Sequence, residues 1–119
     1  MEELKKMAAD FGLKYAEKHE LIKKDPLFGL AVACIYADGF QFGFDYEGTK
    51  EDWKKNGGDL AMKYVEERDA EIMKKEPLLG IVFVIAYKAG VEKGIEERDV
   101  VQLDRDEQGN IIGISTNKN

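Results

Sequence analysis

Apolar side chains recur at three- and four-residue steps near the start of the chain. Over residues 3–24, Leu4 and Phe11 belong to such a series, and charged residues separate its members. This spacing is typical of an amphipathic helix. Asp25 and Pro26 then provide an N-cap oxygen and a proline for the first helical position, so the pattern predicts that a second helix begins there.

The next segment is apolar nearly all round, as expected for a helix that is packed on several sides. It also has a competing interpretation. Residues 40–46 alternate strictly between aromatic and other residues, and Gly39 precedes them in a potential turn, which is typical of a strand. The equivalent residues 91–98 are rich in helix formers. We therefore predict helix in both places and keep an αββ-αββ repeat, with residues 27–46 as a hairpin, as the alternative.

That equivalence rests on a duplication within the chain. The segment Lys-Lys-Asp-Pro-Leu-Phe-Gly is followed later by Lys-Lys-Glu-Pro-Leu-Leu-Gly, and their prolines, Pro26 and Pro77, are 51 positions apart (77 − 26 = 51). The same offset relates tyrosines and glycines further along. We infer a single domain over 1–119 that contains two internal repeats, at about 3–44 and 59–98.

The segment between the repeats differs from them in composition. Residues 45–58 are polar and include three glycines, so they are predicted to be a linker. Helices are expected over about 59–76 and 77–98. The second repeat has two more residues than the first between its first tyrosine and its proline, and we expect the end of the third helix to absorb them.

The pattern changes near the C-terminus. Two β-branched runs, 100–104 and 111–115, flank a polar stretch that contains Gly109, which predicts a β-hairpin over 99–116. The expected fold class is therefore mainly α. It is a duplicated helical hairpin that forms a four-helix array, with a C-terminal β-hairpin.

Charge and cysteine content restrict the expected partners. The chain has 18 basic and 24 acidic residues and a net charge of −6, which disfavours nucleic acid and anionic membranes as partners. The longest apolar runs, residues 27–37 and 78–87, are shorter than the roughly 20 residues that span a bilayer. The single cysteine, Cys34, has apolar neighbours and is expected to be a buried thiol in a reducing compartment. We therefore expect a cytoplasmic protein.

Glycines four residues apart form the first candidate site. Gly39 and Gly43 in the first repeat correspond to Gly90 and Gly94 in the second. On a helix, each pair leaves a groove that another backbone can approach closely. We interpret the grooves as packing surfaces between the repeats, with a homodimer or ligand groove as the alternative.

The second candidate site combines tyrosines with the cysteine. Tyr15, Tyr36, Tyr64 and Tyr87 occupy paired positions in the repeats, and with Cys34 they could line a small-molecule site between them. The simpler interpretation is that all five are packing residues. The only histidine lacks the Glu-x-x-His spacing of a helical metal site, so no metal or other cofactor is expected.

Catalytic motifs are absent from the sequence: it contains no Gly-rich phosphate loop, Cys-x-x-Cys pair or His-Glu-x-x-His motif. We therefore do not expect an enzyme. The leading hypothesis is a small acidic interaction or regulatory protein, an inhibitor or adaptor of the kind that phages and mobile elements encode, which masks a partner protein. The alternatives are a small-molecule-binding protein with its site between the repeats and a nucleic-acid mimic.

Overall fold

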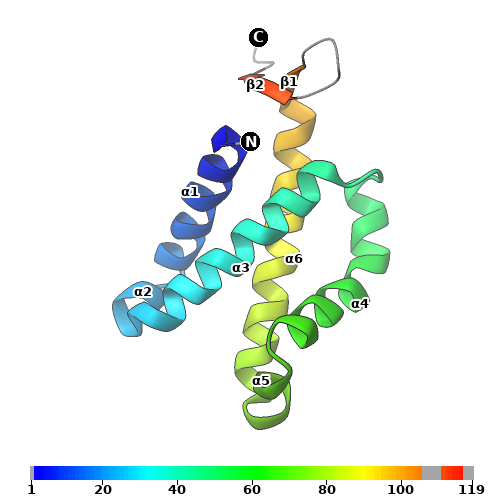
Figure 1. Ribbon diagram of the computed structural model, residues 1–119. Helices are drawn as coiled ribbons and strands as arrows, with labels where there is room; N and C mark the ends of the chain where they lie inside the picture. The colour runs from blue at the N-terminus through cyan, green and yellow to red at the C-terminus, as the bar shows by residue number, and fades with distance from the viewer. Residues whose placement is uncertain (1, 106–110, 117–119) are drawn as a thin grey trace.

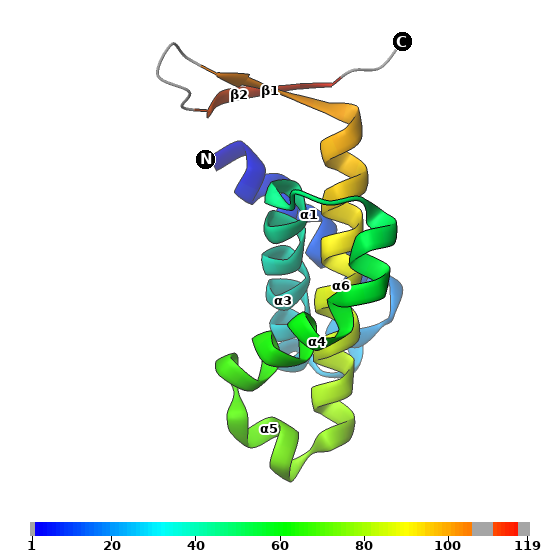
Figure 2. The same cartoon turned by 90° about the vertical axis from the view of Figure 1, so that its right-hand side faces the viewer.

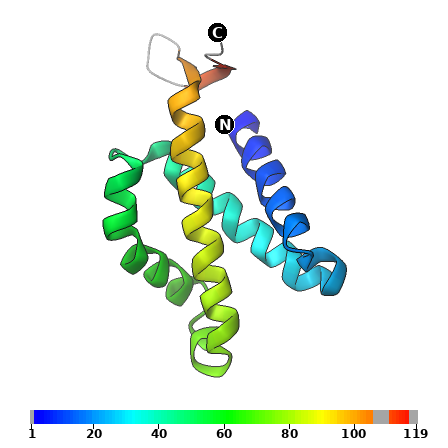
Figure 3. The ribbon, with the colours of Figure 1, turned by 180° about the vertical axis from the view of Figure 1, so that it is seen from behind.

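Two long apolar helices cross at the centre of the molecule and carry the other elements (Figure 1). The computed structural model describes residues 2–105 and 111–116. The helices are α1 (Glu2–Lys18), α2 (Leu21–Lys24), α3 (Pro26–Asp45), α4 (Lys50–Arg68), α5 (Ala70–Lys75) and α6 (Pro77–Val100), and the strands are β1 (Val101–Arg105) and β2 (Ile111–Thr116). Helix α1 packs on α3 and α4 packs on α6, and Figures 2 and 3 show the crossing of α3 and α6 from the side and from behind.

Capping residues explain where the helices begin. The Asp25 carboxylate accepts a hydrogen bond from the Phe28 amide, 3.2 Å away, and Pro26 occupies the first turn of α3. Thr49 and Asp52 form a capping box at the start of α4. Asp69 caps α5 in the same way as Asp25 caps α3. Short polar side chains thus satisfy the free amides at three helix starts.

The first helices of the two repeats bury matching positions. Each helix buries four residues at four-residue steps, and each buried residue of α4 lies 49 positions after its counterpart in α1. The buried residues are Leu4, Ala8, Gly12 and Ala16 in α1 and Trp53, Gly57, Ala61 and Val65 in α4. Helix α2 has four residues and α5 has six. The two additional residues of the second repeat therefore lie in α5, a separate short helix, and not at the end of the third helix as expected.

The expected fold class was wrong in its architecture. A mainly α class fits, but residues 2–100 form six helices and contain no strand. The αββ-αββ alternative is wrong because residues 40–45 continue α3, where Phe40 and Phe44 lie one turn apart and are both buried. Strands β1 and β2 pair only with each other and add no sheet layer to the helices, so a β-hairpin is not a component of the class.

Several expected boundaries also need correction. The predicted linker at 45–58 is reduced to residues 46–49, because the capping box starts α4 at Lys50. The helix predicted over 3–24 breaks after α1, where Glu20 has a positive φ of 59°. Residues 99 and 100 of the predicted hairpin belong to α6.

Candidate functional site

The four predicted glycines lie where α3 and α6 cross. A Cβ atom added to Gly90 would overlap the carbonyl oxygen of Tyr36, and one added to Gly39 would overlap that of Tyr87. One turn further along, Gly43 and Gly94 each lie against the backbone of the opposite helix in the same reciprocal manner. Backbone of the other repeat therefore fills each glycine groove.

The four predicted tyrosines form two separate pairs. Tyr15 of α1 stacks on Tyr36 of α3 with ring centroids 4.7 Å apart, and Tyr64 of α4 stacks on Tyr87 of α6 with centroids 4.0 Å apart. Burial raises the pKa of Tyr36 and of Tyr87 to about 12. Each pair packs the first helix of its repeat onto the long helix, so the tyrosines do not surround one shared cavity.

One tyrosine pair carries a polar cluster that the other lacks. The Tyr64 hydroxyl donates to the carboxylate of Asp38, and the Arg68 guanidinium lies 3.0 Å from both the carboxylate and the hydroxyl. Burial, followed by the hydrogen bond to Asp38, raises the pKa of Tyr64. In the first repeat, His19 takes the place of Arg68, and its ring lies 4.6 Å from that of Tyr15.

Sequence reasoning missed this cluster, although one signal for it was present. Arg68 lies four residues after Tyr64 and therefore on the same face of α4. Asp38 is 26 residues from Tyr64, and only the fold brings the two together. Ala89 of α6 occupies the position equivalent to Asp38.

Cys34 lies apart from the tyrosines. The expectation of a buried thiol was wrong, because Cys34 is exposed on α3. It lines an open apolar groove of about 180 Å³ between α1 and α3, which none of the four tyrosines lines; its other lining residues are Ala9, Leu13, Leu30, Ala33 and Ala37. The residues of the expected small-molecule site are therefore not brought together.

Exposed apolar side chains follow the duplication closely. Leu27 is 81% exposed and its equivalent Leu78 is 79% exposed, while Leu30 and Ile81 are 48% and 47% exposed. We define strip 1 as Leu13, Leu27, Leu30 and Cys34, and strip 2 as the equivalent residues Met62, Leu78, Ile81 and Ile85. A groove joins Leu13 of α1 to Leu30 and Cys34 of α3 in strip 1. In strip 2, Ile85 lines a groove with Tyr15 and other residues of the first repeat. Sequence reasoning missed both strips because an apolar helix was read as buried on all sides.

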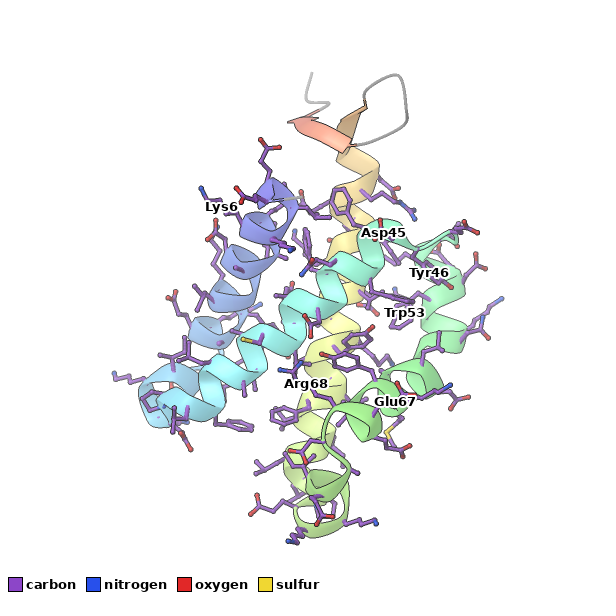
Figure 4. The ribbon with its side chains drawn as sticks, in the orientation of Figure 1. Lys6, Asp45, Tyr46, Trp53, Glu67 and Arg68 are labelled. Atoms are coloured by element: carbon purple, nitrogen blue, oxygen red, sulfur yellow. The ribbon has the colours of Figure 1, made fainter. Side chains whose placement is uncertain are left out.

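Among the residues whose side chains the structure describes, no cluster of three His, Cys, Asp or Glu residues is placed to hold a metal ion. Figure 4 shows Tyr46 and Trp53 in the space between the end of α3 and the first turns of α4, where they belong to a packed aromatic cluster with Phe42.

The chain was compared with known proteins. No family model matches it. No curated protein and no solved structure matches it either.

In the part of the chain that the structure describes, one helix has the length and composition of a membrane span. Helix α3 has 20 residues, and its most apolar 18-residue window has a mean hydropathy of 1.4. Half of that window is buried inside the protein, as in the core helix of a globular domain. This finding alone assigns α3 no role in a membrane.

Proposed function

We propose that this protein is a non-enzymatic interaction or regulatory protein that masks partner proteins by docking them on strip 1 and strip 2. The observation that carries the proposal is the matched exposure of the strips. Leu27 and Leu78, at equivalent positions of two helices, both leave about four fifths of their surface in water. Contiguous exposed apolar residues on a small protein are typical of interaction sites.

The comparison of the two repeats strengthens this interpretation. Polar positions on the same helices differ between the repeats, because Asp38 is matched by Ala89 and His19 by Arg68. The strip positions nevertheless stay apolar, with Leu30 matched by Ile81. Binding of the same kind of apolar partner surface at both strips explains why the strip positions stay apolar while other surface positions differ between the repeats.

The geometry of strip 1 favours a helical partner. Leu27, Leu30 and Cys34 are spaced at i, i+3 and i+7, so they form one ridge along α3. The groove beside this ridge, lined by Leu13 of α1, matches the apolar face of an amphipathic helix. The groove's 180 Å³ is below the roughly 300 Å³ of the smallest typical ligand pockets, so this groove suits a protein side chain better than a small molecule.

Charge substitutions in the strips test the proposal. The partner is first identified from a stoichiometric complex and purified, and its affinity is then measured by calorimetry. The double variant Leu30→Glu/Ile81→Glu should bind it at least about 100-fold more weakly than wild type, because carboxylates would face an apolar surface. Leu60→Glu is the matched control, since Leu60 is 45% exposed on α4 but belongs to neither strip. Equal affinity for the double variant and the control would refute the proposal.

A further inference from the structure

The two repeats meet through an interface that is nearly the same on both sides. Gly39 lies against Tyr87 as Gly90 lies against Tyr36, and both relations share the offset of the duplication. The contact therefore resembles the two-fold interface of a homodimer, formed here within one chain. Such an interface can form equally well between two chains.

A single short connection joins the two repeats covalently. Helix α1 packs on α3 of its own repeat, and α4 packs on α6 of its own. Only residues 46–49 connect α3 to α4, and they include Gly48. The contacts that cross between the repeats, such as that of Arg68 with Asp38, can form from any copy of the partner repeat.

Arg98 holds this connection in its present bend. From the last turns of α6, its guanidinium donates to the carbonyl oxygen of Tyr46 and to that of Gly48, the latter 3.2 Å away. Asp99 binds the same guanidinium at 3.1 Å. The two carbonyls lie on either side of Glu47, so the bend must break both hydrogen bonds if it is to extend.

We infer that two copies of this chain exchange repeats, so that the first repeat of one chain pairs with the second repeat of the other, and that Arg98 opposes the exchange. An exchanged dimer reproduces every helix contact of the monomer, and only residues 46–49 change conformation. A short connection gives the two repeats an effective concentration on the order of millimolar, which a second chain must match. Loss of the Arg98 hydrogen bonds without a change in the length of the connection therefore favours the dimer.

Refolding of mixed chains tests the exchange. Unlabelled and ¹⁵N-labelled full-length protein are unfolded together in urea, refolded at high concentration and analysed by native mass spectrometry. We expect mixed dimers after refolding but none when the native proteins are simply combined, because exchange requires the repeats to separate. Arg98→Ala should raise the dimer-to-monomer ratio at least about tenfold, since hydrogen bonds from a charged group are lost only in the monomer. Arg68→Ala is the control and should leave the ratio unchanged.

A change in the length of the connection provides a second test. Deletion of Glu47 and Gly48 should convert most of the protein to dimer with wild-type helicity, and insertion of two glycines after Gly48 should reduce the dimer below the wild-type level. If the deletion variant does not fold, the refolded mixture of labelled and unlabelled Arg98→Ala chains decides whether repeats are exchanged. Absence of mixed dimers from that mixture overturns the inference, and so do dimers that exchange subunits without unfolding. Mixed dimers that persist in Leu30→Glu/Ile81→Glu distinguish repeat exchange from contact through the strips.

Discussion

The crossing of α3 and α6 leaves no room for a methyl group at Gly90. An ideal Cβ there would overlap the Tyr36 carbonyl oxygen and lie 3.0 Å from the Tyr36 carbonyl carbon and 3.1 Å from the Phe40 nitrogen. These are backbone atoms of a buried helix, so no side-chain rotation can relieve the overlap. Overpacking of this kind costs about 3 kcal/mol, while alanine gains about 1 kcal/mol over glycine in a helix. We therefore predict that Gly90→Ala lowers the free energy of unfolding by about 2 kcal/mol.

Gly58 is the matched control for this substitution. It also lies inside a helix, α4, but a Cβ there meets nothing within 4 Å. Gly58→Ala should therefore raise the free energy of unfolding by about 0.5–1 kcal/mol. Both values follow from urea denaturation monitored by circular dichroism. If Gly90→Ala is as stable as wild type while Gly58→Ala behaves as expected, the close approach of α3 and α6 is wrong.

Two further predictions concern helix capping and alkaline pH. Thr49→Ala removes one half of the α4 capping box and should lower the free energy of unfolding, measured by urea denaturation, by about 1 kcal/mol. Asp52→Asn keeps a hydrogen-bond acceptor and should lower it less. Equal losses of stability in the two variants would contradict the capping geometry. Burial raises the pKa of Tyr36 and Tyr87 to about 12, against about 10 in the unfolded chain, so the folded state favours the protonated phenols. Their contribution to stability is complete below about pH 10 and is lost as the pH rises to about 12. Phenolate absorbance should therefore rise together with loss of helicity. Full ionisation of the tyrosines near pH 10 with intact helices would refute this prediction.

The duplication made much of the helical arrangement predictable from the sequence. Pro26 and Pro77 mark the starts of α3 and α6, since each follows an acidic residue and precedes an apolar run. The spacing of the glycines also predicted a close approach of helices. Such features could be predicted because they depend on local backbone chemistry and on comparison between the repeats.

Other features depend on the tertiary surroundings of each residue. Helix α3 is apolar on nearly every side, so periodicity could not distinguish buried Ile35 from its exposed neighbour Cys34. The start of α4 was missed because Gly57 and Gly58 suggested a loop, whereas Thr49 and Asp52 cap a helix that continues through both glycines. Propensity was overridden in each case by packing or by capping.

Trp53 explains why the two repeats are not packed identically. It occupies the position of Leu4, and Gly57 provides the room for its ring, since a Cβ there would lie 2.6 Å from an indole carbon. Phe42 and Tyr46 surround the ring with centroids 5.8 Å from it, and the indole N–H finds no partner among the described residues. In the first repeat, Gly12 lies directly against the α3 backbone instead. Aromatic packing around Trp53 thus marks the start of α4, whereas a close backbone approach at Gly12 marks α1, and Ala61 takes the position of Gly12 in α4.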